Sequence, residues 1–263
     1  QRAPRQSAIL GSANKTSCLL AVWANSSLAN LLDFDDTYLG HPGCAVIPTA
    51  LAIGEMTKAS GKELLAAVVT GYETANRVAY TLYPSREKAE KILPAVNQVM
   101  GATAVASKLL GLDKGQMMNA FGLACGCAPI AMPVAIYKNT TIGFFKNGFG
   151  WAAMSGVFWA FAAKEGVDGP SGVLDDQDFP LRTGSDASDL GRLVYGLGQK
   201  YTILDVALKP YPACRLLHTS LDAMQSILKT GDIRAEEIEA IRVRGIKELL
   251  HMCNASPQHL VDA

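Results

Sequence analysis

Apolar residues along the first half of the chain repeat with the spacing of helices. Residues 19–32 combine small and apolar side chains, which predict a buried helix ending at the acidic run that begins with Asp33. A loop follows at residues 40–43, where glycines and a proline surround one histidine and favour irregular backbone. The next helix is expected to begin near Pro48.

A capping box marks the start of a long helix. Ser60 precedes Glu63 by three residues, ahead of apolar residues with helical spacing. In such a box each side chain accepts a hydrogen bond from the backbone N–H of the other residue. We expect this helix to run toward Leu82 and to stop at Tyr83-Pro84-Ser85.

Helical spacing returns in later segments. Residues 96–110 predict a helix that Gly111 ends, because glycine favours the left-handed conformation common just after a helix. Asp113 is expected to cap the helix that follows. Residues 129–146 lose the periodicity and predict irregular backbone, and residues 148–163 regain it with many small side chains.

The pattern changes near residue 200. Residues 201–208 are short and β-branched, residues 216–228 have helical spacing, and residues 238–245 alternate with the period of a half-buried strand. We therefore expect a mainly α protein. It would consist of a large all-helical domain over residues 1–200 and the start of a smaller α+β lid domain, truncated in this chain, over residues 201–263.

The composition is that of an ordinary globular protein: 263 residues, 49% hydrophobic, with 24 basic and 24 acidic side chains. A formal charge of zero gives no long-range field toward nucleic acid or an anionic membrane. No apolar run reaches the roughly 20 residues of a membrane span. We expect neither nucleic acid nor membrane as a partner, and the six scattered cysteines fit reduced thiols in a cytosol-like compartment.

Motifs for metals and nucleotides are missing from the sequence. The pair Cys125-Gly126-Cys127 lacks the further spaced thiols of a zinc or iron–sulfur site. No glycine-rich dinucleotide motif, Walker lysine or H-E-x-x-H helix is present. We therefore expect no metal and no cofactor.

One candidate site is the cluster of Asp33, Asp35, Asp36 and His41 at a boundary between helix and loop. A carboxylate beside a histidine fixes the imidazole tautomer and raises its basicity, as a general base near neutral pH requires. The alternative is an acidic helix end followed by a turn with a surface histidine.

Further candidates are lysines. Lys138 and Lys146 bracket a segment of Thr, Gly and Phe between apolar helices, where an ammonium group can bind a carboxylate or an oxyanion; the alternative is a pair of solvated lysines. Lys209 precedes two prolines around a tyrosine, which hold it in a defined place. His218 follows Cys214 by four residues, a weak nucleophile pair because most cysteines are buried small hydrophobes.

Taken in order, several of these motifs resemble the MmgE/PrpD family. They are the run of residues 32–37 (Leu-Asp-Phe-Asp-Asp-Thr), His41-Pro42-Gly43, the helix of residues 104–112, and Lys209-x-Tyr-Pro-x-Cys with His218 and Asp222-Ala223. The resemblance covers nearly the whole chain. Because family members are considerably longer and the chain begins with Gln1, we expect it to be part of a longer protein.

The resemblance implies a helical domain with a smaller α+β lid, a homodimer, and a site in the cleft between the domains. The family's known reactions are dehydration of 2-methylcitrate, decarboxylation of cis-aconitate and epimerisation of iminodisuccinate, all on small polycarboxylates. The resemblance also implies that Asp33 and His41 lie in the site and that Lys138 and Lys209 match lysines of the family. Our hypothesis is that these four residues are catalytic, with His41 oriented by Asp33, and that Lys138, Lys209, Lys146 and His218 bind substrate.

One position departs from the decarboxylase branch of the family. Where that branch has a second active-site histidine, this chain has Ile92, which cannot transfer a proton. A 2-methylcitrate dehydratase-like lyase is therefore our first expectation. An epimerase, a cis-aconitate decarboxylase and a catalytically silent carboxylate-binding relative are the alternatives. The expected location is the cytoplasm, or the mitochondrion in a eukaryote.

Overall fold

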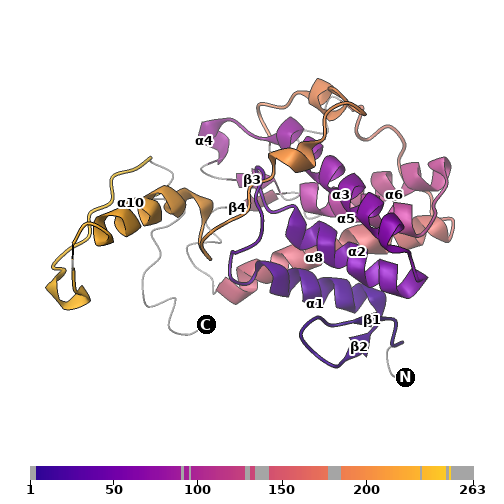
Figure 1. Cartoon of the computed structure of the whole chain (residues 1–263). Coiled ribbons are helices and arrows are strands. Elements are labelled where there is room, and N and C mark those ends of the chain that lie inside the picture. Colours follow the sequence, from indigo (N-terminus) through magenta and orange to yellow (C-terminus); the bar gives the residue numbers. More distant parts are fainter. Residues whose placement is uncertain are drawn as a thin grey trace.

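A computed structural model describes residues 4–89, 92–94, 96–127, 131–133, 142–176, 185–231, 233–246 and 249. It confirms a mainly helical protein, in which most of the long helices pack into one bundle (Figure 1). The helices are α1 (Cys18–Asn30), α2 (Gly43–Thr57), α3 (Gly61–Leu82), α4 (Arg86–Ala89), α5 (Val96–Leu109), α6 (Lys114–Cys127), α8 (Ile142–Lys164) and α10 (His218–Leu228). Short 3-10 turns are η1 (Leu190–Leu193), η2 (Thr202–Asp205), η3 (Arg215–Leu217) and η4 (Ala235–Glu237).

The strands of the described residues are very short and form two antiparallel pairs. β1 (Ser7–Ala8) pairs with β2 (Lys15–Thr16), with Ser7 opposite Thr16. β3 (Ile92–Pro94) pairs with β4 (Ala131–Pro133), with Leu93 opposite Met132. Neither pair carries the core, which lies between helices.

Helix α5 is the centre of the bundle and packs against α2, α3, α6 and α8. Every residue from 96 to 107 is buried, and many of them are Gly, Ala, Ser or Thr. A helix that is buried on all sides needs side chains that neighbours can approach closely from every direction. The small side chains of α5 meet this need.

Glycines let α8 approach two of its neighbours. A Cβ atom on Gly150 would lie 2.2 Å from Ser27 Oγ in α1, and one on Gly156 would lie 2.4 Å from the carbonyl oxygen of Val99 in α5. Real Cβ atoms do not come this close, so these positions require glycine. The small residues predicted for this helix therefore set the spacing of the bundle.

The predicted helix ends are largely confirmed. The capping box is present, because Glu63 accepts from the backbone N–H of Ser60 at 2.7 Å and Ser60 Oγ accepts from Glu63 N–H at 3.3 Å. Gly111 has a φ of 67° just after α5, and Asp113 accepts from the N–H of Gln116 at 2.8 Å.

Two helices begin earlier than predicted. α2 starts at Gly43 rather than near Pro48, which lies inside the helix, because the carboxylate of Asp36 accepts from the N–H of Gly43 at 2.9 Å and caps the helix from upstream. α8 starts at Ile142, so Lys146 is helical rather than in irregular backbone. Packing of α8 against α1 and α5 outweighs the poor helix propensity of its glycines.

The two strands predicted after residue 200 are wrong. Residues 202–205 form the 3-10 turn η2, and only Ala207 makes a bridge, antiparallel to Thr37. Residues 238–246 pair with no strand of the described chain, and Ile241 and Val243 are exposed instead of half-buried. A strand needs a partner for its backbone groups, and alternation of residue types does not supply one.

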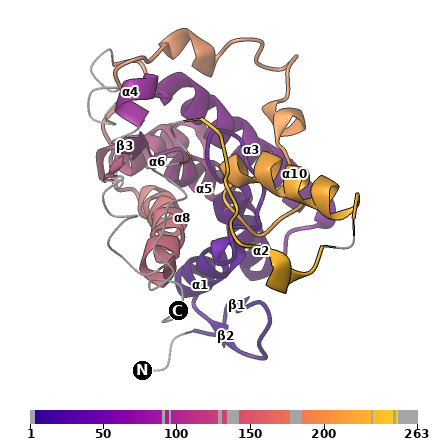
Figure 2. The ribbon, with the colours of Figure 1, turned by 90° about the vertical axis from the view of Figure 1, so that its left-hand side faces the viewer.

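Helix α10 and its flanking turns stand apart from the bundle (Figure 1), on the side that faces the viewer in Figure 2. The helix confirms the periodicity predicted for residues 216–228. None of the helices in the described ranges combines the length and apolar character that crossing a bilayer requires.

Candidate active site

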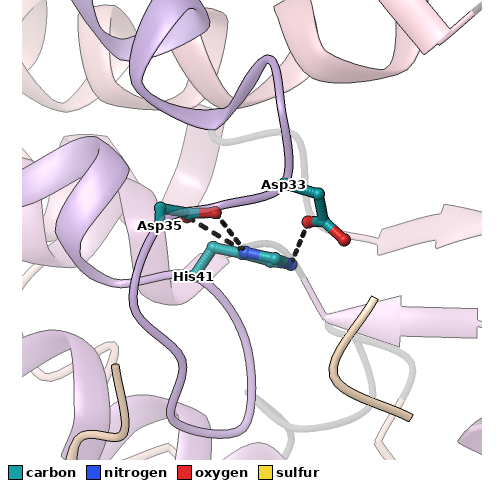
Figure 3. Close-up of side chains that lie close together, drawn as sticks. All are labelled: Asp33, Asp35 and His41. Carbon is teal, nitrogen blue, oxygen red and sulfur yellow. Dashed lines mark hydrogen bonds and ion pairs between the residues drawn. The ribbon is translucent and has the colours of Figure 1, made fainter. Parts of the chain in front are cut away.

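The loop between α1 and α2 has an unusual backbone. Asp33 and Leu39 have φ values of 52° and 43°, and Gly40 has 148°. Left-handed conformations are uncommon for residues with a Cβ and cost of order 1–3 kcal/mol each. Such strain persists where the surroundings fix it, and here it turns Asp33 and His41 toward each other (Figure 3).

His41 lies between two carboxylates, one at each ring nitrogen (Figure 3). Its Nδ1 is 3.0 Å from Asp35 Oδ2 and 3.2 Å from Asp35 Oδ1, and its Nε2 is 3.8 Å from Asp33 Oδ1. Asn30, the last residue of α1, donates from Nδ2 to Asp35 Oδ1 at 2.8 Å. The ring of Phe149 in α8 meets the imidazole edge to face at 5.1 Å.

Lys209 reaches this cluster from a distant part of the chain. Its Nζ donates to the carbonyl oxygen of Asp33 at 2.8 Å and lies 3.1 Å from Asp33 Oδ1 and 3.9 Å from Asp35 Oδ1. The side chain of Lys209 is 1% exposed. A buried ammonium group requires such carboxylate and carbonyl partners, so Lys209 neutralises part of the negative charge around His41.

Backbone pairing delivers Lys209 to the loop. Thr37 and Ala207 exchange hydrogen bonds of 2.9 and 3.0 Å, which join the loop to the segment that carries Lys209. Further upstream, Arg77 in α3 donates to the carbonyls of Leu193, Tyr195 and Lys200. Helix α3 thus fixes the path of this segment before it meets the loop.

The environment shifts the two inner carboxyl groups in opposite directions. Burial raises the pKa of Asp35, but hydrogen bonds and charge from His41, with help from Asn30 and Lys209, hold it below the usual value. Burial dominates at Asp36 and raises its pKa, although hydrogen bonds from Tyr72 and from the N–H of Gly43 act the other way. Asp35 is therefore the firmly ionised partner of His41, and Asp36 serves the start of α2.

The same residues could supply ligands to a cation, since one atom each from Asp33, Asp35 and His41 lies within 4.8 Å of the others. The ammonium group of Lys209 already contacts both carboxylates and provides the positive charge there. The arrangement therefore suits acid–base chemistry with an internal cation. A cavity of about 550 Å³ lies beside Asp35 and Asp36, lined mainly by apolar side chains, and His41 is not among its lining residues.

The structure brings together only part of the predicted set. Asp33, His41 and Lys209 meet, whereas His218, at the start of α10, bonds the carbonyl oxygen of Ala213 at 3.1 Å and packs against Tyr211. Lys138 lies outside the described residues. Lys146 lies in α8, one turn before Phe149, and its side chain is not described.

Sequence reasoning gave the orienting role to Asp33 and missed two neighbours of His41. Asp35, rather than Asp33, is within hydrogen-bonding distance of the ring. Asn30 and Phe149 were missed. The sequence shows only a polar residue at the end of an apolar helix; the structure adds that this amide is fully buried and therefore needs a polar partner.

Comparison with known proteins decides the family. The sequence model of the MmgE/PrpD N-terminal domain matches residues 1–190. The chain belongs to the MmgE/PrpD family. The resemblance inferred from the acidic run, the His-Pro-Gly motif and the lysine motif is thereby confirmed.

Relatives of this MmgE/PrpD chain include cis-aconitate decarboxylases. The human enzyme is 30% identical over 222 residues, covering 80% of this chain and 44% of the relative. The mouse enzyme is 29% identical over 223 residues, with 80% and 43% covered. That of Aspergillus terreus is 25% identical over 243 residues, with 83% and 47% covered. The chain thus spans less than half the length of these relatives.

Proposed function

We propose that this MmgE/PrpD chain forms the helical part of a lyase that acts on a small polycarboxylate by acid–base catalysis. His41 would move a proton at a carbon next to a substrate carboxylate, without a metal or cofactor. The observation that carries the proposal is the histidine held between an ionised carboxylate and an Asp–Lys pair. General acid–base transfer of this kind contributes about 10²–10⁴-fold to a rate.

The charge of the described cluster bears on how substrate would bind. Two carboxylates face one ammonium group, and the ammonium of Lys209 is buried against Asp33. A polycarboxylate needs further cations, because negative charge on the enzyme repels it. We assign this role to Lys138 and Lys146, and the position of Lys146 one helical turn before Phe149, which contacts His41, supports the assignment.

The role of Lys209 also changes from the one expected. We propose that it acts on substrate through Asp33, by holding that carboxylate in place, instead of binding a substrate carboxylate directly. Its 1% exposure and its two contacts with Asp33 support this role. His218 contacts Ala213 and Tyr211 in its own segment. We propose that it binds substrate as part of the lid, the smaller domain proposed for residues 201–263.

Two reactions compete for this site. Dehydration of 2-methylcitrate removes a proton next to a carboxylate and releases hydroxide as water, and Ile92, in place of a second histidine, favours it over decarboxylation. Decarboxylation of cis-aconitate releases carbon dioxide and adds a proton to carbon, and the names of the relatives favour it. Both reactions use one proton transfer at the same kind of carbon.

We also propose a homodimer. Helix α1 buries some of its side chains in the bundle, but its residues Leu20, Trp23 and Leu28 are exposed. Apolar side chains gathered on one helix face support association with another protein surface. Light scattering on the purified protein would measure the mass, and a monomer at micromolar concentration would contradict the proposal.

Proton NMR in D₂O, with 2-methylcitrate, citrate, cis-aconitate and iminodisuccinate supplied in turn, tests the function. A new alkene from 2-methylcitrate would establish the dehydratase, and itaconate with loss of carbon dioxide from cis-aconitate would establish the decarboxylase. Scrambled stereochemistry would establish an epimerase. If no compound changes and none takes up deuterium, the lyase proposal is wrong and a silent carboxylate-binding relative takes its place.

A further inference from the structure

The two nitrogens of His41 have different surroundings. Nδ1 is 3.0 Å from Asp35 Oδ2, a hydrogen-bonding distance, whereas the 3.8 Å between Nε2 and Asp33 Oδ1 is too long for one. Figure 3 shows the ring with Asp35 at one end and Asp33 at the other. Only one end of the ring is therefore held by a direct hydrogen bond.

Burial gives the ring an inner and an outer end. The side chain of Asp35 is 6% exposed, that of Asp33 is 17% exposed and that of His41 is 23% exposed. Phe149 packs against the ring and restricts its rotation. Nδ1 thus points inward to Asp35, and Nε2 points to the more open end of the cluster.

Asp33 is committed to a different partner. Lys209 contacts both its backbone oxygen and its carboxylate, at 2.8 and 3.1 Å. The third acidic residue of the loop, Asp36, accepts from Gly43 N–H and bonds Tyr72. Among the residues that the structure describes, the charged groups around His41 are therefore Asp33, Asp35, Asp36 and Lys209, and of these only Asp35 lies at hydrogen-bonding distance from a ring nitrogen.

We infer that Asp35 is the positioning residue of His41: it fixes the tautomer with hydrogen on Nδ1 and leaves Nε2 as the nitrogen that transfers the proton. An ionised carboxylate can only accept, so Nδ1 must donate to it. Asn30 completes the arrangement by donating to the other oxygen of Asp35 at 2.8 Å. Reversing the amide would place two oxygens at that distance, so Nδ2 must face Asp35.

With hydrogen on Nδ1, the 3.1 Å contact between Asn30 Nδ2 and His41 Nδ1 is not a hydrogen bond, because both atoms are donors; each donates instead to Asp35, at 2.8 and 3.0 Å. The arrangement is a chain of Asn30, Asp35 and His41 that ends at Nε2. The catalytic half of the inference rests on the proposed function, whereas the tautomer does not.

The matched pair Asp35→Asn and Asp33→Asn tests the inference, because each change removes one charge from the same loop and keeps the side-chain size. Nitrogen-15 NMR of histidine-labelled protein reports the tautomer, and His41→Gln identifies the resonance. Wild type and Asp33→Asn are expected to show hydrogen on Nδ1 of neutral His41. Asp35→Asn is expected to show hydrogen on Nε2 or a mixture, since the new amide can donate to Nδ1.

Kinetics on the substrate identified by the panel form the second readout. Asp35→Asn should lower kcat by about 10²-fold or more with little change in KM, and should change the pH profile of kcat. Asp35→Glu should restore part of kcat, because it returns an acceptor-only group. An unchanged tautomer in Asp35→Asn, or a changed one in Asp33→Asn, would overturn the inference. If wild type turns over no substrate, the proposed function is wrong. The NMR result still tests the tautomer, because it does not depend on turnover.

Discussion

At the scale of single residues, the acidic run distributes three carboxylates among three tasks. Asp33 meets Lys209, Asp35 meets His41, and Asp36 accepts from Gly43 at the start of α2. The sequence places these residues in one cluster but does not tell them apart. Their roles depend on the left-handed backbone at Asp33 and on a lysine from a distant segment, neither of which local pattern reveals.

The raised pKa of Asp36 predicts a dependence of stability on pH. Folding favours the protonated form of this carboxyl group, so the free energy of unfolding falls as pH rises from the unfolded pKa through the folded one. Above the folded pKa, the ionised Asp36 lowers the free energy of unfolding by its full amount. Asp36→Asn keeps an acceptor for Gly43 and removes the charge, so the variant should be more stable than wild type at pH 7.

Urea unfolding at several pH values measures this difference. The advantage of Asp36→Asn should shrink as pH falls and be smallest below 3.8, where wild type binds the proton in both states. Asp35, whose pKa is lowered, loses its own contribution in acid in both proteins. A variant that is less stable than wild type at pH 7 would show that the charge of Asp36 stabilises the fold.

At the scale of elements, the sequence predicts helices well where the signal is local. The capping box of α3 and the glycine after α5 lie within one turn of the ends that they mark. The start of α2 was missed because its cap, Asp36, lies seven residues upstream of Gly43 and reaches it through the loop. The predicted strand at residues 238–245 was wrong because alternation does not reveal whether a partner strand exists.

A matched pair of glycines tests the cap of α2. Gly43 and Gly61 are each the first residue of a helix. A Cβ on Gly43 would lie 2.1 Å from Asp36 Oδ1, whereas Gly61 has nothing within 4 Å. Gly43→Ala should therefore lower the free energy of unfolding by about 1–3 kcal/mol, by displacing the carboxylate.

Gly61→Ala is the control and should leave stability unchanged or raise it by up to about 1 kcal/mol, because alanine restricts the unfolded chain. Chemical denaturation of both variants gives the comparison. Equal effects at the two positions would mean that Asp36 moves aside without loss and that the cap contributes little.

At the scale of the whole molecule, the site depends on contacts between segments far apart in sequence. Arg77 in α3 is 7% exposed at its side chain, forms an ion pair with Glu73 and donates to carbonyls of residues 193–200. Glu73 in turn accepts from Thr202 and from the N–H of Ile203. Arg77 and Glu73 thus hold residues 193–203 against α3, just before the bridge between Ala207 and Thr37 that precedes Lys209.

Arg77→Met should therefore release residues 193–203. Removing one partner of a buried ion pair leaves Glu73 uncompensated and costs about 3–5 kcal/mol. Limited proteolysis should cut this segment faster than in wild type, and urea unfolding should give the loss of stability. Arg192→Met is the control, because its ion pair with Asp189 is more exposed and should contribute at most about 1 kcal/mol. Similar results for both arginines would contradict the guiding role of Arg77.

The central claim is that His41 transfers the proton, and the turnover of His41→Gln on the substrate found by the NMR panel tests it most directly. Glutamine keeps a donor for Asp35 but cannot act as a base, so kcat should fall by about 100-fold or more while the midpoint of thermal unfolding stays near that of wild type. A correctly folded His41→Gln protein with unchanged turnover would remove His41 from the reaction and contradict the account.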